Sequence, residues 1–84
     1  MVHSIRLEPS AKKELRALAR GLQKRILKAA RKLRNNPRPP GCKKLKGLDA
    51  YRIRAGDYRI VYEIHDDVLI VLVIRVAHRR EVYR

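Results

Sequence analysis

The sequence predicts an α+β domain: an N-terminal strand, a helical hairpin and a three-stranded antiparallel meander, with all strands in one sheet and the helices on one face. Apolar residues recur every three or four positions over residues 15–33, which is typical of a helix buried on one side. From residue 51 onward apolar and polar residues alternate, as in strands of a sheet. With 84 residues, the chain has room for one such domain, residues 1–84.

The N-terminal half contains the predicted helical hairpin. A strand is expected over Val2–Leu7, because apolar and polar side chains largely alternate there. Pro9 suits the first turn of a helix, since that position needs no N–H donor. Gly21 interrupts the helical pattern, so we expect two antiparallel helices that meet there. The second helix should stop at Asn35–Pro37, because the residue before a proline disfavours helical geometry.

The C-terminal half contains the predicted meander. Residues 35–47 hold three of the four prolines and two of the four glycines, so we expect a loop. Strands should then follow over Tyr51–Arg54, Tyr58–Ile64 and residues 68–76, with turns at Ala55–Asp57 and His65–Asp67. Tyr58 and Tyr62 are in phase with Ile60, so both are expected in the core.

Composition excludes several classes of protein. Apolar residues make up 45% of the chain, too many for a disordered basic tail. The longest apolar run, Val68–Ile74, is too short to span a bilayer, and the first residues lack the apolar core of a signal peptide. Cys42 is the only cysteine, and no Cys/His cluster has zinc-ligand spacing. We therefore expect a cytoplasmic protein with no membrane, metal or cofactor requirement.

The positive charge is concentrated in the middle of the chain. The net charge is +14, and residues 11–48 carry fourteen Lys and Arg against Glu14, a net +13. Such a field favours polyanions, because phosphates that contact Lys or Arg release counterions. An acidic protein partner is also compatible, whereas an anionic membrane is disfavoured because the basic segment has no Trp or Phe anchors. The predicted RNA-binding residues are Lys28, Arg31, Lys32, Lys43, Lys44 and Lys46.

Three arginines are candidates for binding a phosphate. Arg52 and Arg54 alternate with apolar residues on one strand, and Arg59 begins the next. If the turn between them places Arg54 opposite Arg59, all three share a sheet face. Converging like charges are unfavourable without an anion, so the pattern is compatible with a phosphate clamp. The alternative is a solvated outer surface, the usual role of alternating polar residues.

The C-terminal residues and histidines add further candidates. Tyr83 could stack on an unpaired base, and His78 could carry a proton near neutral pH. The alternatives are an edge residue for Tyr83 and a turn residue for His78. His3 and His65 have no partner at meaningful spacing, so we expect core or turn positions for both.

Two motifs resemble the RelE family of bacterial and archaeal toxins. One is Gly56–Ile64, which contains Asp-Tyr-Arg-Ile-Val-Tyr, and the other is the closing Ala77–Tyr83 with its His-Arg-Arg-Glu-Val-Tyr. Lys44–Leu48, the paired helices and the length fit as well, so the resemblance covers nearly the whole chain. It implies a RelE-like microbial ribonuclease fold, a RelB-like antitoxin partner and a toxin–antitoxin hetero-oligomer.

The resemblance also implies a reaction. RelE-like toxins enter the ribosomal A site and cleave messenger RNA without a metal, by attack of a ribose 2′-hydroxyl that leaves 2′,3′-cyclic phosphate and 5′-hydroxyl ends. Arg59 and Arg79 match family residues that stabilise charge on the phosphate, and Tyr83 matches the one that orients the nucleotide. The strongly basic middle segment would draw the toxin to ribosomal RNA or to an acidic antitoxin.

The chain departs from the family pattern at two positions. Arg52 and Arg54 stand where well-known members have lysines for positioning and proton transfer. Arginine does not give up its proton in proteins, so phosphate binding is the expected role of both, and His78 becomes the candidate for proton transfer. Two alternatives stay open: a ParE-type toxin that inhibits DNA gyrase, and an RNA-binding module without catalysis.

Overall fold

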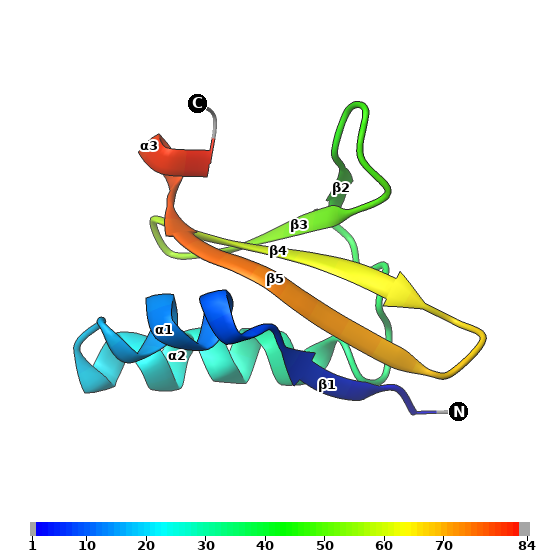
Figure 1. Ribbon diagram of the computed structural model, residues 1–84, viewed down its shortest axis with the longest axis horizontal. Helices are drawn as coiled ribbons and strands as arrows, with labels where there is room; N and C mark the ends of the chain where they lie inside the picture. The colour runs from blue at the N-terminus through cyan, green and yellow to red at the C-terminus, as the bar shows by residue number, and fades with distance from the viewer. Residues whose placement is uncertain (1, 83–84) are drawn as a thin grey trace.

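Helices α1 and α2 cover one face of a five-stranded sheet, whereas α3 lies on the other side of the sheet (Figure 1). The computed structural model describes residues 2–82. Its elements are β1 (Ser4–Leu7), α1 (Pro9–Arg16), α2 (Arg20–Lys32), β2 (Lys43–Lys44), β3 (Tyr51–Ala55), β4 (Tyr58–His65), β5 (Ile70–His78) and α3 (Arg79–Val82). The predicted α+β class is confirmed, and the meander is formed by β3, β4 and β5.

The strand order in the sheet is β1-β5-β4-β3-β2. The first strand is parallel to β5, with Ser4 opposite Ile70 and Leu7 opposite Val73, and the other pairs are antiparallel. The sequence predicted only a loop over residues 35–47, which is wrong for Lys43 and Lys44. These two residues pair with the start of β3 and form a short edge strand.

The two helices meet before Gly21 and not at it. Helix α1 ends at Arg16 and α2 begins at Arg20, so Gly21 lies in the first turn of α2. The side chain of Gln23 fixes the turn between them by donating a hydrogen bond to the carbonyl oxygen of Leu18 at 2.8 Å. Within residues 2–82, none of the helices combines the length and the apolar character needed to cross a membrane.

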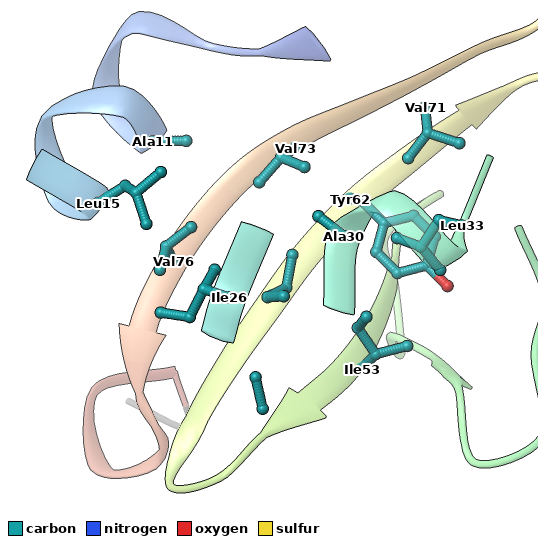
Figure 2. Close-up of a cluster of buried hydrophobic side chains, with 12 residues drawn as sticks. Ala11, Leu15, Ile26, Ala30, Leu33, Ile53, Tyr62, Val71, Val73 and Val76 are labelled. Carbon is teal, nitrogen blue, oxygen red and sulfur yellow. The ribbon is translucent and has the colours of Figure 1, made fainter. Parts of the chain in front are cut away.

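The core lies between the two helices and the sheet. Figure 2 shows α1 contributing Ala11 and Leu15 beside β5, while α2 contributes Ile26 and Ala30, and Leu33 follows directly after α2. The largest fully buried side chains are Tyr62, Leu33, Ile60, Val71 and Val73. Tyr62 is therefore in the core as predicted, whereas Tyr58 is half-buried against it.

Tyr62 also fastens the loop after α2. Its hydroxyl donates a hydrogen bond to the carbonyl oxygen of Pro37 at 2.7 Å. Burial raises the pKa of this hydroxyl, because the phenolate would lose its hydration. The Tyr62 ring stacks on Tyr51, with centroids 6.1 Å apart, and the Arg38 guanidinium lies 5.5 Å from the centre of the Tyr51 ring. This cluster holds the loop against the end of the sheet.

A carboxylate covers the part of β5 that β1 leaves unpaired. The first strand pairs with β5 only as far as Val73. Beyond that point, Glu14 of α1 accepts a hydrogen bond from the backbone N–H of Val76 at 3.0 Å and lies 3.5 Å from Nε of Arg75. Glu14 thereby satisfies a donor that would otherwise be free on the strand edge.

Candidate nucleic-acid interface

The register of β3 and β4 brings three arginines to one face of the sheet. Arg54 lies directly opposite Arg59, and Arg52 stands two residues before Arg54 on the same strand. The alternating residues Ile53 and Ile60 pack in the core under the helices. Arg52, Arg54 and Arg59 therefore share the face turned away from α1 and α2, as the alternation predicted. We call this surface the arginine face.

Two of the three arginines are buried. Arg52 is 4% exposed and Arg59 is 5% exposed, whereas Arg54 is open to solvent. The alternative of a solvated outer surface is therefore wrong for Arg52 and Arg59. Burying a guanidinium costs free energy unless polar groups or anions compensate it, and arginine is rarely found at such low exposure. The arginine face thus concentrates positive charge in a site that is largely shielded from water.

Lysines of β2 lie beside this face. Lys43 is opposite Arg52 in the β2–β3 pair, so it is on the arginine face. Lys44 is opposite Tyr51 instead, and its Nζ lies 4.0 Å from Oδ1 of Asp49. Lys46 is exposed in the segment that follows β2. In Figure 1, β2 and the loop after it lie on the same side of the sheet as α3.

Arg79 lies at the same end of the sheet as Arg54 and Arg59. It begins α3, and its backbone N–H donates a hydrogen bond to the carbonyl oxygen of Asp57 at 2.8 Å. Asp57 belongs to the turn that joins β3 to β4, so the start of α3 is fixed beside the ends of both arginine-bearing strands. The Arg79 side chain is exposed. Tyr83 lies outside the described residues.

The structure does not bring His78 to the arginine face. His78 is opposite Tyr58, and the two rings meet edge-on with centroids 5.5 Å apart. Tyr58 packs on the core, so His78 is on the side of the sheet that faces the helices. The cause is a bulge in β5, where one extra residue, Ile74, reverses the alternation of the strand. Nδ1 of His78 accepts a hydrogen bond from the backbone N–H of Arg80 at 3.3 Å.

The predicted RNA-binding residues form two surfaces. Lys28, Arg31 and Lys32 are exposed on α2, which lies on the side of the sheet opposite α3 (Figure 1). Lys32 approaches the arginine face around the edge of the sheet, because it lines a groove together with Arg54. The positive charge of the middle segment is therefore divided between two parts of the surface.

His3 has the core position that was predicted, but both His3 and His65 have partners that the sequence did not indicate. His3 is buried, and its Nε2 lies 3.0 Å from Oδ1 of Asp66, while Arg38 donates to Oδ2 of the same carboxylate at 3.0 Å. Arg38 and His3 hold the pKa of Asp66 below its ordinary value, because both hydrogen bonds favour the carboxylate. His65 lies 2.9 Å from Glu63, a pairing between neighbours on one strand face that the alternation could have indicated.

Similarity to known proteins places the chain in a family. Residues 5–83 match the family described as the ParE toxin of the type II toxin–antitoxin system parDE. A RelE-like toxin protein of Escherichia coli is 34% identical over 82 residues, which cover 94% of this chain and 85% of that protein. This chain belongs to the RelE/ParE superfamily of type II toxins.

Solved structures of RelE toxins share the fold. A mutant E. coli RelE in the free state has a TM-score of 0.81 and 32% identity, covering 99% of this chain and 92% of that chain. The RelBE2 toxin–antitoxin complex of Mycobacterium tuberculosis has a TM-score of 0.85 and 26% identity, covering 94% and 100%. The intact E. coli RelBE complex has a TM-score of 0.79 and 30% identity, covering 90% and 95%. The resemblance to RelE toxins is thereby confirmed.

Membership of the RelE/ParE superfamily makes this protein the toxin of a type II toxin–antitoxin system. The matching family carries the ParE name, whereas the relative and the solved structures carry the RelE name. Both the ribonuclease hypothesis and the gyrase hypothesis therefore belong to this superfamily.

Proposed function

We propose that this toxin is a metal-independent endoribonuclease that cleaves messenger RNA in the ribosomal A site. The observation that best supports the proposal is the burial of Arg52 and Arg59 on the same sheet face as exposed Arg54. A toxin that acts only by binding another protein does not need two shielded guanidinium groups beside an open one. Cleavage of a phosphodiester uses positioned cationic donors such as these, because negative charge develops on the phosphate in the transition state.

In the proposed reaction, a ribose 2′-hydroxyl attacks the adjacent phosphorus and the 5′-oxygen of the next nucleotide leaves. The products are a 2′,3′-cyclic phosphate and a 5′-hydroxyl. Arg59 and Arg79 stabilise the charge on the phosphorane, while Arg52 and Arg54 bind the phosphate. Guanidinium groups suit this role because they donate paired hydrogen bonds to two phosphate oxygens and keep their charge. Tyr83 is proposed to stack on the nucleotide base.

Proton transfer needs a group other than arginine, because a guanidinium does not titrate in the working range. His78 remains our candidate. It is next to Arg79 in the chain, at the end of β5, and its ring contacts Tyr58. His78 would therefore exchange a proton with the bound RNA at the end of the sheet, and not at the centre of the arginine face.

The proposed partners follow from charge and from the superfamily. Two of the solved structures above are complexes of toxin with antitoxin. We propose a RelB-like antitoxin with acidic side chains for this toxin as well, in a hetero-oligomer that covers the basic surface and prevents indiscriminate binding to RNA. In the absence of the antitoxin, the ribosome and messenger RNA in the cytoplasm are the proposed targets. Lys28, Arg31, Lys32, Lys43, Lys44 and Lys46 are the proposed contacts with RNA.

The decisive experiment adds purified toxin to a reconstituted translation reaction and maps the ends of the message. We expect cleavage within the A-site codon, with 2′,3′-cyclic phosphate and 5′-hydroxyl ends. Arg54→Ala should reduce cleavage strongly, and the variant should remain folded because the Arg54 side chain is exposed. Arg59→Ala tests the role of a buried arginine on the same face. Arg6→Ala, which removes an exposed arginine from the distant strand β1, is the matched control.

Two results would contradict the proposal. Unchanged cleavage by both Arg54→Ala and Arg59→Ala would show that the arginine face does not act on the phosphate. An intact message, together with inhibited DNA supercoiling by purified gyrase, would favour the gyrase hypothesis, which the match to the ParE family supports. Binding of RNA without cleavage of any message would favour the non-catalytic module.

A further inference from the structure

An arginine that the sequence did not single out reaches the turn beside the arginine face. Arg25 projects from α2 toward Gly56, the first residue of the turn between β3 and β4. A β-carbon built on Gly56 would lie 3.6 Å from both Cζ and Nη1 of Arg25. Gly56 has φ +63°, a conformation that favours glycine, so the turn presents bare backbone to the guanidinium.

Three other arginines surround the same turn. Arg54 precedes it on β3, Arg59 follows it on β4, and Arg79 is hydrogen-bonded to the turn through the carbonyl oxygen of Asp57. Among the side chains of residues 2–80, no carboxylate oxygen lies within 4.0 Å of the side-chain nitrogens of Arg25, Arg54 or Arg79. Like charges gathered at one turn repel one another, and an anion that binds between them reduces that repulsion.

A groove lies along the flank of α2, beginning one helical turn beyond Arg25. Residues 25, 29 and 32 lie four and three positions apart, so Arg25, Ala29 and Lys32 share one side of the helix. Ala29 and Lys32 line a groove of about 350 Å³ between α2 and β3, with Leu33 and Ile53 in its apolar wall. Arg54 lines the same groove, which connects it to the arginine face.

The edge of β3 is open at this groove. The short strand β2 pairs only with Tyr51 and Arg52, so in the described part of the chain Ile53–Ala55 pair with β4 on one side and have no strand on the other. The chain turns away before β2 at Gly41, which has φ +91° and also lines the groove. The groove therefore combines an apolar wall, a strand edge that β2 does not cover, and the cations Lys32 and Arg54 in its lining, with Arg25 one helical turn away.

We propose that this groove is a second RNA subsite, which holds nucleotides next to the one bound on the arginine face. Phosphates would contact Arg25 at the turn and Lys32 at the far end, and a base or ribose would lie on the apolar wall. The proposal extends the proposed function, because it gives the RNA a path from the arginine face around the Gly56 turn. RNA is favoured over an acidic peptide because Arg54 belongs to both surfaces and makes them continuous.

Two single-stranded 2′-O-methyl oligonucleotides test the proposal, since they lack the attacking hydroxyl and stay intact. A dinucleotide fills only the arginine face, whereas an eight-nucleotide probe also reaches the groove. We expect Arg25→Gln to weaken binding of the longer probe roughly tenfold, as for loss of one charge-assisted contact. The slope of the logarithm of the binding constant against the logarithm of the salt concentration should also become shallower by about 0.7. Binding of the dinucleotide should be unchanged. Lys32→Gln should have the same effect as Arg25→Gln.

The matched control is Lys24→Gln, which removes one exposed charge from the adjacent position of α2. Equal effects of Lys24→Gln and Arg25→Gln on binding of the longer probe would show that Arg25 acts only through general electrostatic attraction. That result would overturn the proposal. An unchanged affinity for both probes in Arg25→Gln, with weaker binding of poly-L-glutamate, would assign the groove to an acidic peptide and also overturn it. Because the readout is binding, its failure is distinct from a failure to cleave messages.

Discussion

The hydrogen bond between Tyr62 and Pro37 gives a stability prediction that the structure makes quantitative. Tyr62→Phe removes only the hydroxyl, from a side chain that is 0% exposed, and leaves the Pro37 carbonyl oxygen without its donor at 2.7 Å. Loss of such a bond should cost about 1.5 kcal/mol, which is roughly 6–12 °C in Tm for a domain of this size. Urea unfolding followed by circular dichroism measures the free energy directly.

The same substitution should also change the dependence of stability on pH. Burial raises the pKa of Tyr62 in the folded state, whereas a tyrosine in the unfolded state ionises near pH 10. Between about pH 10 and the pKa of the folded state, only the unfolded state therefore loses the proton. Stability should therefore fall above about pH 10 by up to about 1.4 kcal/mol per pH unit from this group alone. Tyr62→Phe should show a correspondingly shallower alkaline decline.

The control for Tyr62→Phe is Tyr58→Phe, which also removes one tyrosine hydroxyl. In the described part of the chain the Tyr58 hydroxyl makes no hydrogen bond, and its ring is half-buried. We expect this variant to match the wild type in urea unfolding. Equal stability losses for the two variants, or an unchanged alkaline decline in Tyr62→Phe, would refute the reasoning.

Two further predictions concern carboxylates. Glu14→Ala should lower the free energy of unfolding by about 1–2 kcal/mol, because it leaves the Val76 N–H without an acceptor. Glu14→Gln keeps an oxygen there, so it should lose less stability. Equal losses of the two variants in urea unfolding would contradict this prediction. Arg38 and His3 lower the pKa of Asp66, so their stabilising effect is present above about pH 4 and is lost as the pH falls through the folded value. Asp66→Asn should therefore flatten the acid limb of a thermal-melting series, and an unaltered limb would show that the cluster contributes no stability.

The strands were predictable because their signal is local. Alternation places Arg54 opposite Arg59 once the turn at Gly56 is recognised, and the structure has that register. The arginine face therefore follows from the sequence. The burial of Arg52 and Arg59 does not, because exposure depends on what packs over a strand and alternation says only which side a residue faces.

The remaining differences come from interactions between distant residues. The bulge at Ile74 depends on how β5 pairs with β4, and it moves His78 to the helix side of the sheet. His3 and Asp66 are 63 residues apart, so no spacing rule connects them. Gly21 was a reasonable helix breaker, but the side chain of Gln23 closes the turn two residues earlier and leaves the glycine inside α2.

The parallel pairing of β1 with β5 sets the order in which the toxin can be completed during synthesis. Ser4 cannot pair with Ile70 until the 66 residues that follow Ser4 have been synthesised. Their synthesis takes roughly 3–13 s at ordinary rates of translation. Until then the sheet lacks both β5, which lies between β1 and β4, and the edge that β1 supplies, so Arg59 on β4 has no neighbouring strand on one side. A chain interrupted before residue 70 therefore retains the charge of α1 and α2 but cannot form the finished sheet. The sheet can be completed only after β5 has been synthesised, because β5 links β1 to β4.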